Sequence, residues 1–413
     1  MMSFDRLWAD LAPVGRDPGS GGYHRHAWNA ADAEARAWFT DAARARDLNV
    51  RTDRNGNLWA WWGEPAPGAV ATGSHLDSVP DGGAFDGPLG VASALAAVDV
   101  LRERGLRPHR PLALAVFTEE EGGRFGVPCL GSRLSAGEID PDRVRVLTDA
   151  DGTTWAEAMD GADLDPAAMG PDPGTLDLLD AFVELHVEQG RHLADTPHAL
   201  AAASTVWPHG RWRLDLTGRA DHAGTTRLED RADPMLPFAR TVLAARASAT
   251  AHDARATVGK VRVTPNGTNA IASRVSAWLD ARAADRAALD AVVAGVRAEA
   301  GRSAAEHGVG LTVAQESDTP VVEFPHALRD RIAAVLERRV PEPGVPVLPT
   351  GAGHDAAVLA AHVPTAMLYV RNPTGVSHSP HEWADPEDCH TGVTALADVL
   401  QDLLERPVGE VAP

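Results

Sequence analysis

Apolar positions follow two patterns along the chain, and the first occupies its N-terminal half and its C-terminal end. Short runs that are apolar at nearly every position alternate with segments of helical spacing. The runs are Ala69–Gly73, Pro111–Phe117, Ala181–His186 and Pro364–Val370, and the helical segments include 30–48 and 89–101. A strand buried on both faces has such a continuous run, and intervening helices are typical of parallel connections. We therefore expect an α/β domain with a mainly parallel sheet and helices on both faces.

The second pattern lies between these parts and alternates strictly between apolar and polar positions. It occurs in Arg211–Gly218, Thr257–Val263 and Val275–Arg282, with helical stretches at 233–249 and 284–307. Alternation indicates strands with one exposed face, which is typical of an antiparallel sheet. We predict that residues 1–208 and 323–413 form one domain, and that residues 209–322 form an α+β domain inserted into it.

Composition narrows the classes of function. Of 413 residues, 44 % are hydrophobic and 23 % are charged, which is a normal globular balance. Asp and Glu number 58 and Lys and Arg 38, giving a formal net charge of −20. Because nucleic acids and anionic membranes are bound by basic clusters, we expect neither partner. An anionic substrate would need a local positive site.

The cellular setting is predicted from what the chain lacks. Its two cysteines, Cys129 and Cys389, are far apart and form no CxxC pair, so no disulfide framework or cysteine-ligated zinc is expected. The N-terminus has no basic segment followed by an apolar core, and no apolar stretch is long enough for a membrane helix. We expect a cytoplasmic protein.

Residues that can bind metals follow the predicted parallel strands. They are His75, Asp86 in the glycine-rich loop after it, the acidic run Glu119–Glu121, His186, and His378 beyond the last strand. The carboxyl ends of parallel strands lie at one edge of a sheet, where ligands bind. A single histidine or acidic turn is commonly a plain surface feature. Four separate strand ends that each supply such a side chain favour a site.

Imidazoles combined with carboxylates suit borderline divalent metals such as zinc. A carboxylate between two cations can bridge them, and two cations can together activate one water molecule. Asp77, two residues after His75, is placed to accept its other ring N–H. Adjacent glutamates can divide the work, because one can bind metal while its neighbour moves protons.

Eight motifs, in order between positions 73 and 380, resemble a known group of di-zinc hydrolases. They are GSHLDSVPDGGAFDGPLG, FTEEEGGRFG, ELHVEQG, GRADHAGTT, PNGTNAI, LDAR, GAGHDA and GVSHSP. The group includes allantoate amidohydrolase, N-carbamoyl-L-amino-acid hydrolase and β-ureidopropionase, and it shares the fold of the aminoacylase and carboxypeptidase type metallopeptidases. The EEEGGRF and HVEQG stretches are typical of its carbamoyl branch.

The resemblance implies two divalent metal ions per subunit, zinc first, with manganese or cobalt as alternatives. Their ligands would be His75, Asp86, Glu121, His186 and His378, with Asp86 bridging. Glu120 would be the general base, although the role could fall to another member of Glu119–Glu121. His354 of the GAGHDA stretch is assigned to loop or helix-start structure and not to metal binding.

The resemblance also assigns residues outside the metal set. His222 would reach into the partner subunit's site and polarise the scissile carbonyl, so the inserted domain would join a homodimer and serve as a lid. Asn269 and Arg282 would hold the substrate carboxylate, with Arg282 also acting across subunits, and Gln189 would recognise the ureido end. From the residues alone, His222 could also be a turn residue and Arg282 a surface ion-pair partner.

Three hypotheses about function follow. The leading one is hydrolysis of a ureido, or N-carbamoyl, C–N bond in a small carboxylate substrate, with release of ammonia. The second keeps the metals but makes the substrate an N-acyl amino acid or a dipeptide. The third is an inactive family member that binds a small anion. Arg371, near His378, could contact substrate or only pack outside.

Overall fold

The computed structural model describes residues 3–340 and 344–408, so the outermost predicted positions of the first domain lie outside the described residues. The chain forms two compact units, which are Met1–Ser204 with Glu323–Pro413, and Thr205–Val322. They are described separately below.

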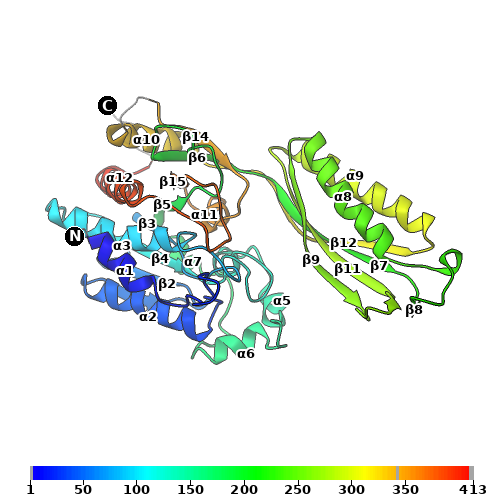
Figure 1. The fold of residues 1–413 in the computed structure, drawn as a ribbon. Coiled ribbons are helices and arrows are strands. Elements are labelled where there is room, and N and C mark those ends of the chain that lie inside the picture. Colours follow the sequence, from blue (N-terminus) through cyan, green and yellow to red (C-terminus); the bar gives the residue numbers. More distant parts are fainter. Residues whose placement is uncertain (1–2, 341–343, 409–413) are drawn as a thin grey trace. The chain divides into compact units, whose positions relative to one another are not determined.

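The described part of the first unit is built on one nine-stranded sheet (Figure 1). Its order is β1-β2-β4-β3-β5-β15-β6-β13, with β14 also paired to β6. The strands are β1 Asn49–Thr52, β2 Leu58–Trp62, β3 Ala69–His75, β4 Leu112–Phe117, β5 Leu179–Val187, β6 Leu200–Val206, β13 Val322–Glu323, β14 Val347–Thr350 and β15 Thr365–Val370. The central pairs β4–β3, β3–β5 and β5–β15 are parallel.

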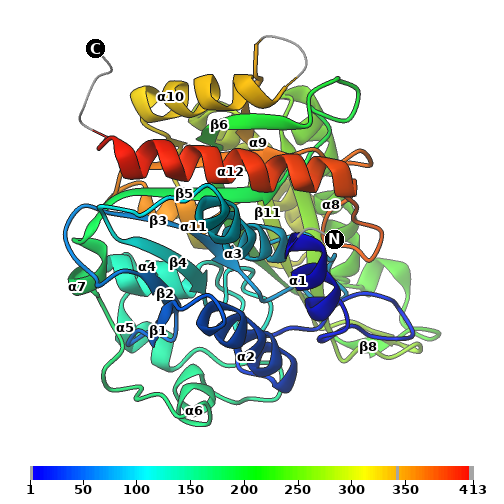
Figure 2. The same ribbon diagram turned by 90° about the vertical axis from the view of Figure 1, so that its left-hand side faces the viewer.

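Helices cover both faces of this sheet. Alternate residues of β5, such as Leu185, join the main hydrophobic cluster with apolar residues of α3 and α12; Figure 2 shows these two helices lying across one face. Successive side chains of a strand point to opposite faces. Glu184 accordingly points the other way, where it accepts the main-chain N–H of Ala356 in α11. The continuous apolar runs arise because neither face meets water.

The remaining helices of this unit join the strands or cap the sheet. They are α1 Ser3–Leu11, α2 Ala30–Arg44, α3 Pro88–Glu103, α4 Leu130–Ala136, α5 Pro141–Arg145, α6 Trp155–Asp160, α7 Pro173–Leu176, α10 His326–Leu336, η2 Glu337–Arg339, α11 Asp355–Leu359 and α12 Pro386–Glu405. Helix α3 begins at Pro88, directly after Gly87, whose φ of +84° is a conformation that favours glycine. This sharp start places Asp86 next to the residue that precedes the helix.

The second unit contains a four-stranded antiparallel sheet of order β12-β7-β11-β9. Its elements are β7 His209–Thr217, β8 Asp221–His222, η1 Leu228–Asp230, α8 Met235–Ala251, β9 Arg255–Thr264, β10 Ala270–Ile271, β11 Arg274–Arg282, α9 Arg286–Glu306 and β12 Gly310–Thr319. Helices α8 and α9 pack together, and the inward side chains of the strands form a core with α9. The short strands β8 and β10 pair with each other.

The predicted fold class is confirmed: a large, mainly parallel sheet is accompanied by a separate antiparallel one. Strand β6 was not predicted, because its sequence LAAASTV is rich in alanine, which has low strand propensity. No helix within the described residues has both the length and the apolar character needed to cross a membrane.

Candidate metal centre

Four adjacent parallel strands deliver the predicted residues to one edge of the large sheet. His75 is the last residue of β3, and His186 is the next to last of β5. Glu119–Glu121 follow β4 after one residue, and His378 lies in the loop between β15 and α12. Because β4, β3, β5 and β15 are neighbours with parallel pairing, their carboxyl ends converge.

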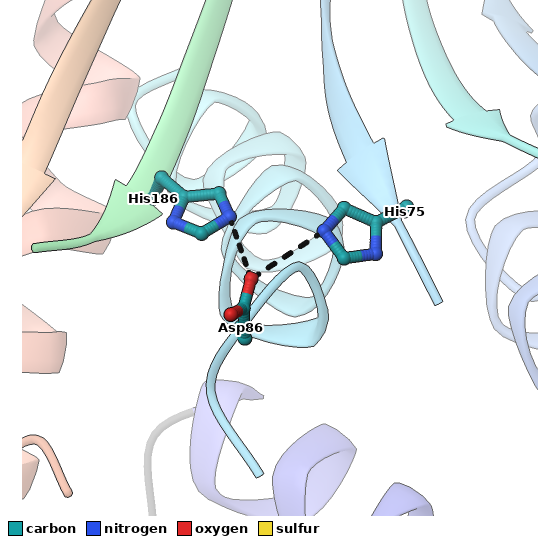
Figure 3. A group of neighbouring side chains, drawn as sticks. All are labelled: His75, Asp86 and His186. Carbon is teal, nitrogen blue, oxygen red and sulfur yellow. Dashed lines mark ion pairs between the residues drawn. The ribbon is translucent and has the colours of Figure 1, made fainter. Parts of the chain in front are cut away.

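Asp86 is the centre of this arrangement. Its Oδ1 lies 3.2 Å from Nε2 of His186 and 3.6 Å from Nε2 of His75, as Figure 3 shows. Its Oδ2 lies 3.3 Å from Nε2 of His378, which is also 3.3 Å from Oε2 of Glu121. The five predicted ligands are therefore brought together in two groups, His75–Asp86–His186 and Asp86–Glu121–His378, that share one carboxylate.

The donor atoms of the first group fit a cation. His75 and His186 are fully buried, and Nε2 of each has no hydrogen-bond partner. On the other side of each ring, Nδ1 of His75 lies 3.0 Å from the main-chain oxygen of Asp77, and Nδ1 of His186 lies 2.9 Å from that of Val187. A carbonyl accepts only from a protonated nitrogen, so each Nε2 directs a lone pair toward Asp86.

Asp77 contacts the ring of His75 through its main-chain oxygen. The hydrogen bond from His75 goes to its main-chain oxygen, while its carboxylate Oδ1 is 3.6 Å from the ring. That carboxylate instead accepts the main-chain N–H groups of Glu120 at 3.2 Å and Glu121 at 3.1 Å. Asp77 thus orients both His75 and the acidic loop.

Burial and close charges shift the ionisation of these groups strongly. Burial alone would raise the pKa of Asp86, but the adjacent imidazoles of His186, His378 and His75 hold it well below its usual range. Burial would lower the pKa of His378, but its bonds with Asp86 and Glu121 raise it to about 11. The centre therefore favours an ionised Asp86 beside positive charge.

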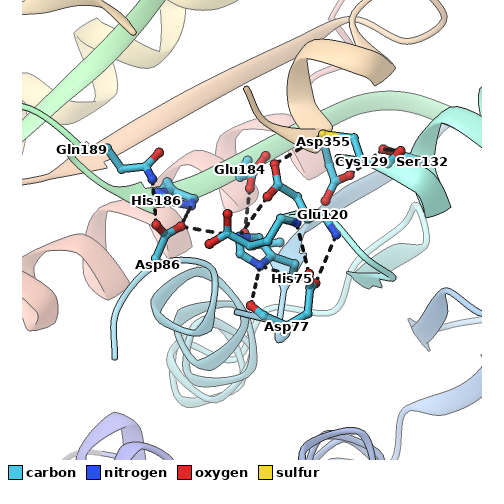
Figure 4. A network of polar contacts seen from close by, with 12 residues as sticks. His75, Asp77, Asp86, Glu120, Cys129, Ser132, Glu184, His186, Gln189 and Asp355 are labelled. Atoms are coloured by element: carbon cyan, nitrogen blue, oxygen red, sulfur yellow. Dashed lines mark hydrogen bonds and ion pairs between the residues drawn. The ribbon is translucent and has the colours of Figure 1, made fainter. Parts of the chain in front are cut away.

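The two uncoordinated glutamates occupy different environments. Glu119 has a φ of +54°, and its Oε1 accepts the main-chain N–H groups of Arg124 and Phe125, so it anchors its own loop. Glu120 belongs to neither ligand group, yet its Oε2 lies 3.7 Å from Nε2 of His75 (Figure 4). The Cys129 thiol donates to its Oε1 at 3.3 Å, and burial raises the pKa of Glu120 well above its usual value.

Gln189 also contacts the centre. Its Nε2 donates to Oδ2 of Asp86 at 2.7 Å and lies 3.4 Å from Nε2 of His378. Its Oε1 is buried and has no hydrogen-bond partner. The side chain therefore presents an unused acceptor beside the groups that would hold metal.

Two residues near the centre were not assigned a role there from sequence. His354 precedes α11, and its ring meets that of His186 edge-on at 4.5 Å, within a third group formed with Glu184. Both oxygens of Glu184 already accept hydrogen bonds, from Ser74 and Ala356, so this group supports His186 from behind. The second is Glu382, whose Oε2 accepts the main-chain N–H groups of Phe85 and Asp86.

In the second unit, His222 and Asn269 lie on the paired strands β8 and β10 or next to them. The main-chain oxygen of Asn269 accepts the N–H of Ala223. Nδ1 of the exposed His222 accepts N–H groups from Gly224 at 3.0 Å and Thr225 at 3.2 Å. The neutral ring must therefore carry its proton on Nε2, which makes that atom a donor.

Two arginines are engaged in ion pairs. Arg282 ends β11, and its Nε and Nη2 donate to the two oxygens of Asp280 at 2.8 and 3.2 Å. Arg371 donates to both oxygens of Asp388 and to the main-chain oxygen of Thr196. Of the two roles left open for Arg371, these contacts support packing outside the centre.

Comparison with known proteins gives consistent similarities. The sequence profile described as peptidase family M20/M25/M40 matches residues 71–402. The chain is 36 % identical to an N-carbamoyl-L-amino acid amidohydrolase of Geobacillus stearothermophilus, over 98 % of this chain and 100 % of that protein. It is 31 % identical to allantoate amidohydrolase of Escherichia coli, over 95 % of each. A crystal structure of a hydantoinase/carbamoylase family amidase from Burkholderia vietnamiensis is 30 % identical, with a TM-score of 0.90 over 99 % of this chain and 98 % of that one.

Proposed function

The chain belongs to peptidase family M20/M25/M40, and from this premise we propose that it is a metal-dependent amidohydrolase. It cleaves a ureido C–N bond in a small carboxylate substrate, as an N-carbamoyl-amino-acid hydrolase or an allantoate amidohydrolase does. The observation that carries this proposal is the carboxylate of Asp86, shared between two groups of metal-ligating side chains at one sheet edge.

Two divalent cations are proposed for the centre, zinc first and manganese or cobalt as alternatives. His75, Asp86 and His186 would hold one, and Asp86, Glu121 and His378 the other. When bound, such cations polarise a carbonyl oxygen and lower the pKa of water. The unpartnered Nε2 atoms of His75 and His186 support this assignment, as does the mixed imidazole and carboxylate donor set.

The proton transfers are assigned to Glu120. A carboxylate oxygen of Glu120 accepts a proton from the attacking water and returns it to the leaving nitrogen. Nε2–H of His222, oriented by the hydrogen bonds that Nδ1 accepts, donates to the carbonyl oxygen as negative charge develops on it. The products are the amine and carbamate, which breaks down to ammonia and carbon dioxide.

Substrate selection is assigned to Gln189, Arg282 and Asn269. The free Oε1 of Gln189 can accept from the terminal amide of a ureido group. Arg282 and Asn269 would bind the substrate carboxylate. A planar guanidinium is suited to bidentate binding of a carboxylate.

The proposal predicts ammonia release from a defined panel of compounds. Purified protein supplied with zinc, manganese or cobalt should release ammonia from allantoate or from at least one N-carbamoyl-L-amino acid. N-acetyl amino acids and dipeptides in parallel serve as the contrast. Cleavage of these contrast compounds without carbamoyl turnover would instead show that the protein is an N-acyl amino acid or dipeptide hydrolase.

The positions of His222 and Arg282 within the second unit support a homodimer with shared sites. Strands β8 and β10 lie beyond the Arg274 end of β11. At this end the main-chain N–H of Gly218 donates to the main-chain oxygen of Ser273. Arg282 is at the other end, where it pairs with His209. Eight steps at a rise of about 3.3 Å separate these ends by about 26 Å. One small substrate cannot span that distance, so we propose that two copies supply these residues.

The same unit offers a surface suited to a second copy. Strand β9 is at an edge of its sheet, and Val261 on it is 46 % exposed. The adjacent helix α8 exposes Leu236 and Leu243, the latter 71 % exposed. Open strand edges and neighbouring exposed apolar side chains are typical of subunit interfaces. We propose that α8 and β9 form the dimer contact.

A mixing experiment tests the shared site. His222→Ala and Glu120→Gln homodimers should each be inactive, whereas their heterodimer should recover activity because one of its two sites has both residues. Activity after unfolding and refolding the mixture, with two affinity tags to isolate heterodimers, is the measurement. Confirmed heterodimers that stay inactive would place both residues in one subunit's site.

A second mixture locates Arg282. If Arg282 acts with the metal centre of its own chain, heterodimers of His222→Ala and Arg282→Ala should recover activity. If Arg282 and His222 came from the same subunit, each site of that heterodimer would lack one of them and activity would stay low. The distance along β11 leads us to expect recovery.

A further inference from the structure

A buried carboxylate links the two loops that carry Asp86 and His378. Glu382 is 3 % exposed. Its Oε2 accepts the main-chain N–H of Phe85 at 2.8 Å and that of Asp86 at 3.0 Å. Its Oε1 accepts from the Ser377 hydroxyl at 3.2 Å. One side chain thus holds the main chain at the shared ligand and the residue before His378.

The surroundings of Glu382 are shaped to keep the carboxylate in this position. A Cβ added at Gly83 would lie 2.2 Å from Oε2 of Glu382, so the loop passes over the carboxylate without a side chain. Phe85 stacks on Trp8 at 4.8 Å and meets the ring of Trp383 edge-on at 5.8 Å. The loop of Asp86 is therefore fixed by packing on one side and by Glu382 on the other.

Ser377 connects Glu382 to the side chain of Asp86. Its hydroxyl lies 3.1 Å from Oδ2 of Asp86 and 3.2 Å from Oε1 of Glu382, and its single proton can be donated to only one of them at a time. Without Glu382, the buried N–H groups of Phe85 and Asp86 lose their acceptor. Buried donors are costly to leave unsatisfied, so the loop would move to find other partners.

We propose that Glu382 is a positioning residue that sets the metal affinity of the centre. It holds the main chain at Asp86 so that both carboxylate oxygens stay aimed at their histidine partners, and it touches no metal. This inference rests on the proposed metal centre. Groups that orient metal ligands typically contribute about 10-fold to 100-fold in affinity.

Zinc titration of chelator-stripped, full-length protein tests the role. For Glu382→Ala we expect an affinity about 10-fold to 100-fold lower. Glu382→Gln should stay close to the unaltered protein, because its amide oxygen can accept the same two N–H groups. The matched control is Asp402→Ala, which removes a buried carboxylate of α12 that accepts from Arg331 of α10 and should leave zinc affinity unchanged.

A second variant should also lower the zinc affinity, but without removing the carboxylate of Glu382. Gly83→Ala should push Glu382 away from Phe85 and Asp86, because Gly83 has no left-handed conformation and the added methyl group is the only change. Thermal unfolding in the presence of chelator would measure the folding cost of each variant separately from its zinc affinity.

The outcomes separate this inference from the proposed function. Weaker zinc binding by Glu382→Ala and Gly83→Ala, with Glu382→Gln and Asp402→Ala near normal, supports the role. The role is overturned if Glu382→Ala or Gly83→Ala, whichever folds, binds zinc as tightly as the unaltered chain. If the unaltered protein binds zinc but releases no ammonia from any ureido compound, the proposed function fails while the role of Glu382 stands.

Discussion

Asp86→Ala is expected to lose both metals and all measurable ureido hydrolysis. Asp86 is the only residue common to the two ligand groups found within the described residues, so its removal takes one donor from each. It also removes the carboxylate that contacts both buried rings, His75 and His186. The loss of affinity should exceed the roughly 100-fold typical of losing an outer partner of a metal ligand. Elemental analysis of the purified variant and ammonia release are the measurements.

The matched control for this variant is Asp81→Ala in the same loop. Asp81 is half exposed and pairs with His24 at 3.0 Å, away from both ligand groups. It should keep its metal content and its activity. An Asp86→Ala protein that retained two metals per subunit would show that the two groups do not share this carboxylate.

The location of the centre could be predicted because buried parallel strands have a simple signature. Runs such as Ala181–His186 are apolar at nearly every position, so a histidine that closes one is recognisable as lying near a strand end. Parallel strands share the edge at which they end, which makes the convergence of His75 and His186 a consequence of topology. No tertiary contact had to be known.

The supporting contacts could not be predicted in the same way. Glu382 and the carboxylate of Asp77 both bind main-chain N–H groups of loops that are distant in sequence. A main-chain donor has no residue type, so no sequence pattern marks its partner. His354 was placed correctly before a helix, but its contact with the His186 ring depends on how α11 packs on β5.

The strand register was needed to show that His222 and Arg282 lie at opposite ends of the antiparallel sheet. The two-residue strands β8 and β10 are too short to show any periodicity, so the sequence did not reveal at which end of the antiparallel sheet they lie. The pairing of Arg274 with Thr217, and of Arg282 with His209, fixes the two ends. The sequence alone therefore suggested that both residues act in the partner subunit's site. The register instead favours a site that takes His222 from one subunit and Arg282 from the other.

Glu120→Gln is expected to retain its metals but to lose at least about 100-fold in kcat, as expected when a general base is removed. Glu120 belongs to neither ligand group, so metal content should not change. Glutamine fills the same space and can still accept from the Cys129 thiol, so the fold should be kept. What it cannot do is take a proton from water. Steady-state kinetics with the best ureido substrate, together with elemental analysis, provide the measurement.

Glu119→Gln is the matched control, because it changes the neighbouring residue in the same way. Its amide oxygen can still accept the N–H groups of Arg124 and Phe125, so the loop should hold and most of the activity should remain. The opposite pattern, with Glu120→Gln active and Glu119→Gln inactive, would move the base to Glu119. Since Glu119 is turned toward its own loop while Oε2 of Glu120 lies 3.7 Å from His75, the geometry favours Glu120.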